Sequence, residues 1–182
     1  MRHRHVIALI GLAAVALLTL AACGESEPAT PSGVGARAVA VMTGPDGASM
    51  GTVTLTQVPS GVLVSADVHG LSAGGHGFHI HSVGACAPDF TAAGGHFDPH
   101  ETGHGLMVND TPHPGDLPNI YAGADGAARA DVFTDAVTLD ANADHSLFDA
   151  DGSAIIIHAK PDSYGEEPGA GDRAACGVIQ RA

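Results

Sequence analysis

The chain has 182 residues, a formal net charge of -13 and a single lysine, Lys160, so an extended basic surface for nucleic acid is excluded. An acidic body also repels small anions at long range, so chemistry on an anion would require a local positive group. Hydrophobic residues make up 45% of the sequence but aromatic residues only 4%, which predicts a core of small aliphatic side chains.

The first 22 residues, 1–22, have the organisation of an export signal. Arg2 and Arg4 precede an apolar run over residues 6–20, and Leu-Ala-Ala comes directly before Cys23. The run is shorter than the roughly 20 apolar residues of a transmembrane helix. It resembles a bacterial lipoprotein signal with cleavage before Cys23, whose acyl chains would tether the protein to the outer face of the membrane. An ordinary cleaved signal, with Cys23 incidental, is the alternative.

Residues 23–35 are rich in proline, glycine and serine, lack apolar periodicity and predict a flexible tether. Residues 36–182 then form one domain, which is long enough for a hydrophobic core. With Cys23 assigned to lipid, two cysteines remain, and an even pair in an exported protein predicts a disulfide. The predicted bond joins Cys86 and Cys176.

Residues 37–71 alternate apolar with β-branched polar residues and are interrupted by Pro-Asp-Gly at 45–47 and Pro-Ser-Gly at 59–61. This pattern predicts three strands joined by tight turns. A fourth strand is expected at residues 76–81. From residue 82 to about 125 the alternation is lost and glycine, proline, aspartate and histidine dominate; an irregular segment this long inside a compact domain is usually functional.

Strand-like segments return in the second half of the domain. Residues 127–139 predict one or two strands, residues 154–160 a buried strand and residues 176–180 the closing strand. An irregular segment at 161–174 precedes the last strand. Many short strands, two long loops and no long helix predict an all-β fold, an antiparallel sandwich or barrel.

The sequence HGFHIH over residues 76–81 places His79 and His81 two positions apart. On a strand, side chains two apart face the same side, so the two imidazoles form a bidentate clamp for a metal ion. Imidazole suits copper, zinc, iron and nickel, so the remaining ligands must identify the metal. Further candidate ligands follow downstream: His96, His104, His113 and His158.

Five motifs occur in order: HGFHIH, GGHFDP, a His-containing segment ending in HPGD, IIIHAK and GDRAACGVI. Together they resemble the copper/zinc superoxide dismutase family over nearly all of residues 37–182. The resemblance implies an eight-stranded antiparallel Greek-key β-barrel or sandwich with two long functional loops, a metal-binding loop and an electrostatic loop. It implies an enzyme that converts superoxide to oxygen and hydrogen peroxide by redox cycling of copper, and so protects the cell surface from extracellular superoxide.

The resemblance also assigns metal ligands, with one histidine shared by both ions. The copper ligands would be His79, His81, His96 and His158. The zinc ligands would be His96, His104, His113 and Asp116. Three nitrogens and one carboxylate oxygen suit a closed tetrahedral zinc site. Because no zinc ligand is missing, the sequence favours two metals over the copper-only arrangement of some bacterial relatives.

Three residues receive further roles from the resemblance. Asp162 would hydrogen-bond the copper ligand His79 and the zinc ligand His104, and so fix the orientation of both rings. Arg173 would lie beside copper, where it attracts and orients the anion. In the family, the bridging imidazole, here His96, releases copper and takes a proton on reduction, so Arg173 and His96 are the expected catalytic residues.

Two departures from the family bear on these expectations. The segment between His158 and Arg173 is shorter than in eukaryotic members and carries Glu166 and Glu167, which predicts weaker electrostatic guidance. Cys86 follows the His-x-His motif earlier, as in bacterial members, which leaves the path of this loop and any dimer contact open. Both a monomer and a homodimer fit the sequence.

Two other kinds of protein share part of this pattern. A cupin also carries His-x-His on a strand, but its pattern expects a glutamate shortly afterwards, and residues 82–85 contain none. The second is a cell-surface copper- and zinc-binding or buffering protein on the same scaffold, for which the ligands would suffice without Arg173. Arg173 and Asp162 favour the enzyme. Of the other histidines in the domain, His76 is expected to bond backbone inside the core. Three more are expected to face solvent, with the alternative that His100 borders the zinc loop: His69, His100 and His145.

Overall fold

The computed structural model describes residues 33–108 and 110–182. The predicted signal peptide, the lipidation site Cys23 and nearly all of the tether therefore lie outside the described residues. Within the described part, no helix is long and apolar enough to cross a membrane.

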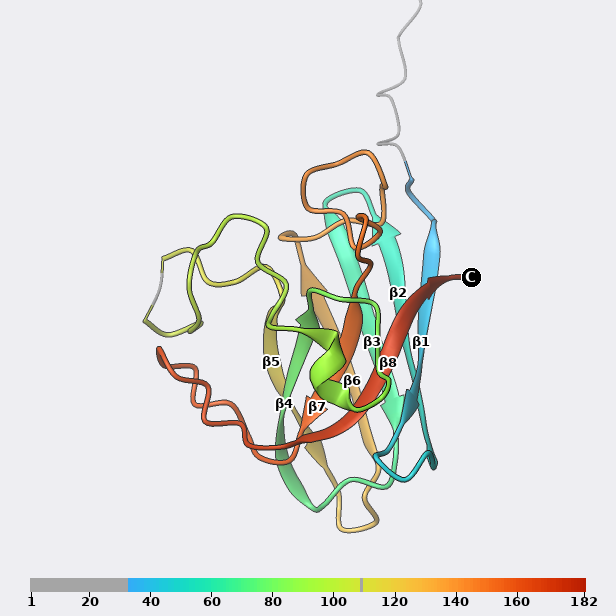
Figure 1. The fold of residues 1–182 in the computed structure, drawn as a ribbon, viewed down its shortest axis with the longest axis vertical. Helices are drawn as coiled ribbons and strands as arrows, with labels where there is room; N and C mark the ends of the chain where they lie inside the picture. The colour runs from blue at the N-terminus through green and yellow to red at the C-terminus, as the bar shows by residue number, and fades with distance from the viewer. Residues whose placement is uncertain (1–32, 109) are drawn as a thin grey trace, which may run out of the picture.

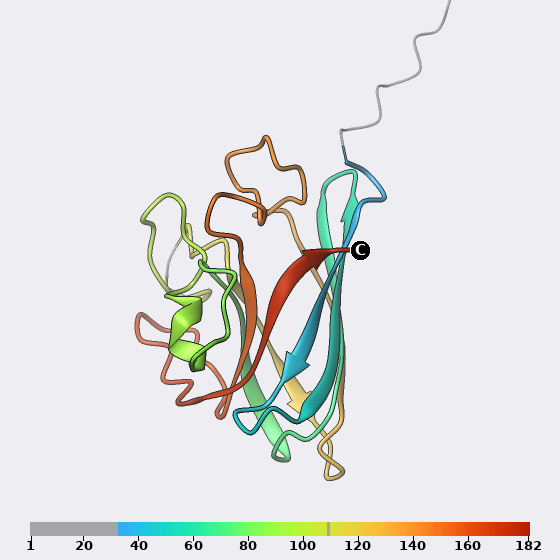
Figure 2. The ribbon, with the colours of Figure 1, turned by 45° about the vertical axis from the view of Figure 1, so that its right-hand side comes forward.

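Eight antiparallel strands form one sheet in the described residues (Figure 1). Their bounds are β1 Arg37–Thr43, β2 Ser49–Val58, β3 Gly61–Val68, β4 Gly74–His81, β5 Asp116–Ala122, β6 Ala128–Thr134, β7 Ala154–His158 and β8 Arg173–Arg181, with a short 3-10 helix η1 at Phe90–Ala93. The order across the sheet is β5-β4-β7-β8-β1-β2-β3-β6. The sheet curls into a nearly closed barrel in which the two edge strands, β5 and β6, approach each other (Figure 2). The crossovers from β3 to β4 and from β6 to β7 give the expected Greek-key topology.

The alternation seen in the sequence determines which side of each strand faces the core. In β1, Ala38, Ala40 and Met42 are fully buried, and the residues between them lie on the outer side. β7 has no alternation, because both of its faces are covered. Ile155 and Ile157 join the barrel core, whereas Ala154 and Ile156 pack beneath η1 in a second cluster with Cys176. A continuous apolar run is the expected signature of a strand buried on both sides.

The structure corrects the extent of the metal-binding loop. Residues 116–122 form β5, although the sequence predicted irregular structure to about residue 125. β5 is an edge strand that pairs with β4, and an edge position tolerates Pro118, which has no N–H to donate. Pro118 and the adjacent Asn119 break the β-branched alternation that marked the other strands. The loop is thus 82–115, and residues 127–139, for which one or two strands were predicted, contain one strand, β6.

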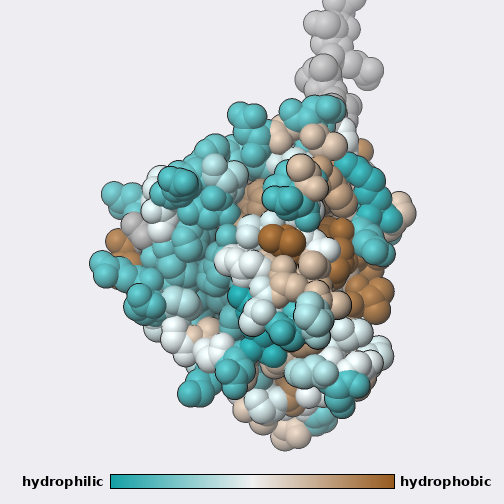
Figure 3. All heavy atoms as spheres, in the orientation of Figure 1, coloured by the Kyte–Doolittle hydropathy of each residue, from teal (hydrophilic) through white to brown (hydrophobic). Residues whose placement is uncertain are grey.

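Three long connections, 82–115, 135–153 and 159–172, lie outside the barrel (Figure 1). Loops 82–115 and 159–172 meet over β4 and β7, and this side of the molecule is largely hydrophilic (Figure 3). The barrel thus supplies rigid strands, and the loops bring polar groups to them from distant parts of the sequence.

Candidate metal centre

Four histidines from three parts of the chain meet on the outer side of β4. His79 and His81 come from β4 itself, and His158 ends the neighbouring strand β7. His96 reaches them because loop 82–115 returns to β4 and pairs with it at His81. One ring nitrogen from each of the four lies within 4.8 Å of the others. The structure therefore brings together all four residues that the sequence assigned to copper.

The nitrogens that face the centre of this group are suited to a metal ion. His79 Nδ1, His81 Nε2 and His158 Nε2 are buried and have no hydrogen-bond partner among the described residues. Burying a polar atom without a partner is costly, so such atoms are normally satisfied by a ligand or an ion. Three converging lone pairs of imidazole, a ligand preferred by copper, fit the copper ion that the sequence predicts.

The opposite ring nitrogens fix which lone pair points inward. His79 Nε2 donates to Asp162 Oδ2 at 2.7 Å and His81 Nδ1 donates to the Gly94 carbonyl at 3.0 Å. His158 Nδ1 donates to the Gly171 carbonyl at 3.1 Å. A neutral imidazole has one N–H, so each of these bonds leaves the inward nitrogen unprotonated and able to bind metal.

The pKa values of these three histidines also favour neutral rings. Burial lowers the pKa of His81 to about 2 and that of His158 to about 4, against smaller opposing effects of their carbonyl partners. Burial also lowers the pKa of His79, although its hydrogen bond to Asp162 acts in the other direction. At neutral pH these rings are uncharged ligands, and the contact between His79 and Asp162 is a hydrogen bond from a neutral ring rather than an ion pair.

A second group of ligands lies on the other side of His96. His96 Nδ1 is 2.6 Å from Asp116 Oδ1. His96, His104 and Asp116 offer ligand atoms within 4.8 Å of one another. His113 Nδ1 lies 3.3 Å from the same Asp116 oxygen and has no hydrogen-bond partner among the described residues. Burial raises the pKa of Asp116, but the hydrogen bond from His96 and the electrostatic effect of that ring outweigh burial. The pKa of Asp116 is therefore lowered, and its carboxylate is ionised. Three histidines and one carboxylate fit a zinc ion.

The glycine of the HPGD motif allows this second group to approach β4. Ile80 N donates to the Gly115 carbonyl at 2.9 Å, and Gly115 N donates to the Phe97 carbonyl at 2.9 Å. A Cβ atom on Gly115 would lie 2.3 Å from the Ile80 carbonyl oxygen, so no larger residue fits there without displacing the backbone. The glycine lets His113 and Asp116 reach the strand that carries the His-x-His pair.

Both ring nitrogens of His104 lie within hydrogen-bond distance of protein oxygens. Its Nδ1 is 2.6 Å from the Gly165 carbonyl, and its Nε2 is 2.9 Å from Asp162 Oδ2 and 3.6 Å from Asp116 Oδ2. A nitrogen that binds zinc must be free of such a partner. Zinc binding by His104 therefore requires one of these two contacts to be released.

Asp162 links the two groups through one oxygen. Its Oδ2 accepts from both His79 and His104, while its Oδ1 accepts from Tyr164 N at 2.6 Å. Burial raises the pKa of Asp162, but the bonds from His79 and Tyr164 outweigh it and lower the pKa to about 2. Asn119 on β5 holds the backbone of Asp162 through two bonds, Asn119 Nδ2 to Asp162 O at 2.9 Å and Asp162 N to Asn119 Oδ1 at 2.7 Å. The carboxylate is thus fixed at the position that the sequence assigned to it.

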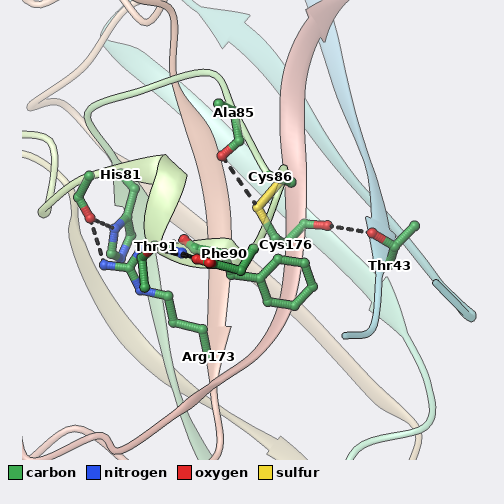
Figure 4. The surroundings of a disulfide bond; sticks show 10 residues. Thr43, His81, Ala85, Cys86, Phe90, Thr91, Arg173 and Cys176 are labelled. Atoms are coloured by element: carbon green, nitrogen blue, oxygen red, sulfur yellow. Dashed lines mark hydrogen bonds between the residues drawn. A yellow bond between two sulfur atoms is a disulfide. The ribbon is translucent and has the colours of Figure 1, made fainter. Parts of the chain in front are cut away.

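Arg173, at the start of β8, lies beside the four-histidine group. Its guanidinium donates to the carbonyls of Phe90 and Gly94, the second at 2.6 Å, and Figure 4 shows it beside His81. Burial lowers its pKa, but a guanidinium remains charged at neutral pH. These two bonds use only part of its five N–H donors, so others remain for an anion.

A disulfide fixes the segment that orients Arg173. Cys86 and Cys176 are bonded, with Cα atoms 5.9 Å apart, and this confirms the predicted pairing. The bond ties loop 82–115 to β8 next to η1 (Figure 4). Gly94 follows the last residue of η1 and has a φ of 74°. Its carbonyl accepts hydrogen bonds from both His81 and Arg173. A Cβ atom there would meet Ser82 Oγ at 2.8 Å.

Sequence reasoning missed several groups that orient the ligands. They are the carbonyls of Gly94, Gly165 and Gly171 and the side chain of Asn119. Carbonyls have no signature in a sequence, because every residue carries one, and Asn119 lies in the strand that was not predicted. His76, by contrast, is in the core as expected: it is 1% exposed, with its ring nitrogens 2.7 Å from the His158 carbonyl and 2.8 Å from the Ser72 carbonyl.

A Greek-key barrel whose outer face carries two adjoining histidine-rich ligand groups defines a two-metal protein. Residues 49–179 match the copper/zinc superoxide dismutase (SODC) family. The chain is 47% identical to a superoxide dismutase [Cu-Zn] of Caulobacter vibrioides over 148 residues, 79% of this chain and 85% of the relative. It also resembles the solved Cu/Zn superoxide dismutase from Brucella abortus, with TM-score 0.66 and 32% identity over 79% of this chain and 99% of that one.

A crystal structure of a SOD-like protein from Bacillus subtilis matches with TM-score 0.69 and 33% identity, over 77% of this chain and 96% of that protein. The chain belongs to the copper/zinc superoxide dismutase family. It is accordingly an enzyme that disproportionates superoxide, and its cofactors are copper and zinc.

Proposed function

We propose that the four-histidine group binds the catalytic copper, that the second group binds zinc, and that the enzyme works at the outer face of the cell membrane. The observation that carries the assignment is four buried imidazole nitrogens without a hydrogen-bond partner among the described residues, three in the four-histidine group and one, His113 Nδ1, in the second group. The copper ligands are His79, His81, His96 and His158. The zinc ligands are His96, His104, His113 and Asp116.

Copper, when bound, supplies one-electron exchange, so that one superoxide is oxidised to oxygen and a second, with two protons, is reduced to hydrogen peroxide. The residues of the chain provide binding and proton transfer. Arg173 attracts the anion and orients it through the N–H groups that its two carbonyl partners leave free. With Nδ1 of His96 directed at Asp116, Nε2 is the nitrogen that can hold a proton for the peroxide product.

The zinc assignment is tested by replacing His113 with alanine. His113 Nδ1 faces the Asp116 carboxylate. Among the ring contacts of the described residues, the His113 ring touches only His96 of the four-histidine group. Loss of a residue that only orients a metal ligand costs about 10-fold to 100-fold in metal affinity. Because His113 is a proposed ligand itself, we expect His113→Ala to lower zinc affinity by at least about tenfold while copper content is retained. Elemental analysis after dialysis measures both. Full zinc content in the variant would contradict the assignment.

Reversing the charge of Arg173 is expected to slow superoxide consumption. Local charge changes the association rate of a steered anion by about 10-fold to 1,000-fold, so we expect Arg173→Glu to lose at least about tenfold at low salt. The rate of the wild type should fall as salt is added, and that of the variant should not. Arg173→Lys keeps the positive charge but not the planar set of N–H donors, and it is the matched control. Its rate of superoxide consumption should lie between those of the wild type and Arg173→Glu. Loss of copper from Arg173→Glu would contradict a steering role.

The membrane location rests on the sequence alone, on the apolar run and the small residues before Cys23. We expect the wild type, expressed with its signal in a bacterial host, to sediment with membranes and to be released by detergent. Cys23→Ala should remain in the membrane as the uncleaved precursor or be released to the soluble fraction, and in neither case should it incorporate labelled fatty acid. Equal labelling of the variant would show that Cys23 is not the acylation site.

A further inference from the structure

His100 and His145, two histidines that the metal centre does not use, lie in contact on the surface. His100 is in loop 82–115 and His145 in loop 135–153, so two histidines 45 positions apart in the sequence bring these loops into contact. His100 Nε2 lies 3.0 Å from His145 Nδ1, and the ring centroids are 4.7 Å apart at an interplanar angle of 77°. The sequence predicted that each would face solvent, with the alternative that His100 borders the zinc loop, and it did not predict their contact.

The backbone on both sides of this pair is held in place. The Asp98 carboxylate accepts from Thr102 N at 2.8 Å and from the Thr102 hydroxyl at 2.9 Å, which closes the turn that contains His100. On the other loop, Thr138 N donates to the His145 carbonyl at 3.0 Å. Two ligands on fixed backbone lose less freedom on binding an ion than two on free loops.

The separation of the two nitrogens matches a chelated ion. Imidazole nitrogens lie about 2.0 to 2.1 Å from a bound first-row ion such as zinc, so two nitrogens 3.0 Å apart subtend about 94° at one ion. A tetrahedral angle would require about 3.3 Å between them. The pair therefore fits two adjacent positions of a tetragonal Cu²⁺ or Ni²⁺ ion as it stands, and zinc after a shift of a few tenths of an ångström.

The surroundings favour a cation. The groove beside the pair is also lined by the carboxyl-bearing residues Asp110, Asp116 and Asp135 and by His113, and none of the described residues that line it is a lysine or arginine. The whole chain carries a net charge of -13, which concentrates cations near its surface. Water or a carboxylate can fill the remaining positions of an ion held by two rings.

We propose that His100 and His145 form a third metal site, which takes one divalent first-row cation of the kind that prefers imidazole, Cu²⁺ most strongly. Each ring binds through the nitrogen that now faces its neighbour. The ring that donates the hydrogen bond between them moves its N–H to its outer nitrogen when the ion binds, so two neutral rings release no net proton. The ion connects loop 82–115, which carries three of the proposed zinc ligands, to loop 135–153. The site uses none of the residues assigned to copper or zinc above, although two of the proposed zinc ligands, His113 and Asp116, line the same groove.

The test is a Cu²⁺ titration of the full-length chain already loaded with copper and zinc, followed by electron paramagnetic resonance. His3 and His5 are replaced by alanine in every sample, so that the N-terminus does not contribute nitrogen ligands. We expect one further equivalent of Cu²⁺ with a nitrogen hyperfine pattern distinct from that of the resident copper. His100→Ala and His145→Ala should each lose this equivalent, and His69→Ala, which removes another exposed histidine, should keep it.

Resident copper and zinc are measured in each variant before titration, together with its melting temperature, so that loss of the added ion is not confused with a damaged fold. Failure of the parent protein to take up a further equivalent would overturn the proposal and leave the pair as a hydrogen bond between two rings. An additional copper signal that persists in both single variants would overturn it equally, because the ion would then be bound elsewhere.

Discussion

Replacing His158 with alanine is expected to reduce superoxide consumption by more than about two orders of magnitude. Loss of a residue that only orients a ligand typically costs 10-fold to 100-fold in metal affinity or activity, and loss of a ligand should cost more. His158 is 7% exposed, and its Nε2 is one of three buried nitrogens that face the four-histidine group without a partner among the described residues. Alanine removes that nitrogen and leaves a cavity that cannot bind copper.

The measurement is elemental analysis and a superoxide assay on the same metal-loaded samples. Wild type should contain about one copper and one zinc per chain and be active. His158→Ala should lose copper and activity but keep zinc, because His158 contacts none of the three residues specific to the zinc group in the described structure. His69→Ala serves as the control for replacing a histidine at the surface. Undiminished activity in His158→Ala would refute the copper assignment, and a wild type that binds both metals without turnover would be a metal-binding protein.

Removing the disulfide is expected to have the largest effect on stability. Cys86 and Cys176 are separated by 90 residues, and the chain-entropy model gives about 4 to 5 kcal/mol for closing a loop of that length in the unfolded chain. The double variant Cys86→Ala/Cys176→Ala should therefore unfold at much lower denaturant concentration. Metal-free proteins are compared, because bound ions add their own contribution to the free energy of unfolding.

The same variant should lose activity at temperatures where it remains folded. The disulfide anchors the segment whose Phe90 and Gly94 carbonyls hold the Arg173 guanidinium, so a mobile segment orients Arg173 less well. Wild type treated with a reductant under unfolding conditions should show the same stability as the double variant. A difference of less than about 1 kcal/mol between the variant and the oxidised wild type would mean that the bond does not constrain the unfolded chain.

Local pattern was sufficient for most of the strands. Alternation in residues 37–68 predicted three of them, because a strand with one buried face must place apolar residues at every second position. The apolar run of β7 predicted a strand covered on both sides. The pattern failed at β5, where Pro118 and Asn119 are compatible with an edge strand but do not distinguish it from a loop.

The sequence by itself determined the chemical character of the centre: the His-x-His pair on one strand face, the order of the five motifs and the cysteine pair. Only the tertiary structure decided which nitrogen of each ring points inward, because that depends on carbonyls and carboxylates contributed by loops far away in sequence. It also decided that Asn119 holds Asp162 and that His100 meets His145. These contacts form between segments with no shared periodicity, so no local pattern records them. The barrel fixes them by holding in place the strands from which these loops start and to which they return.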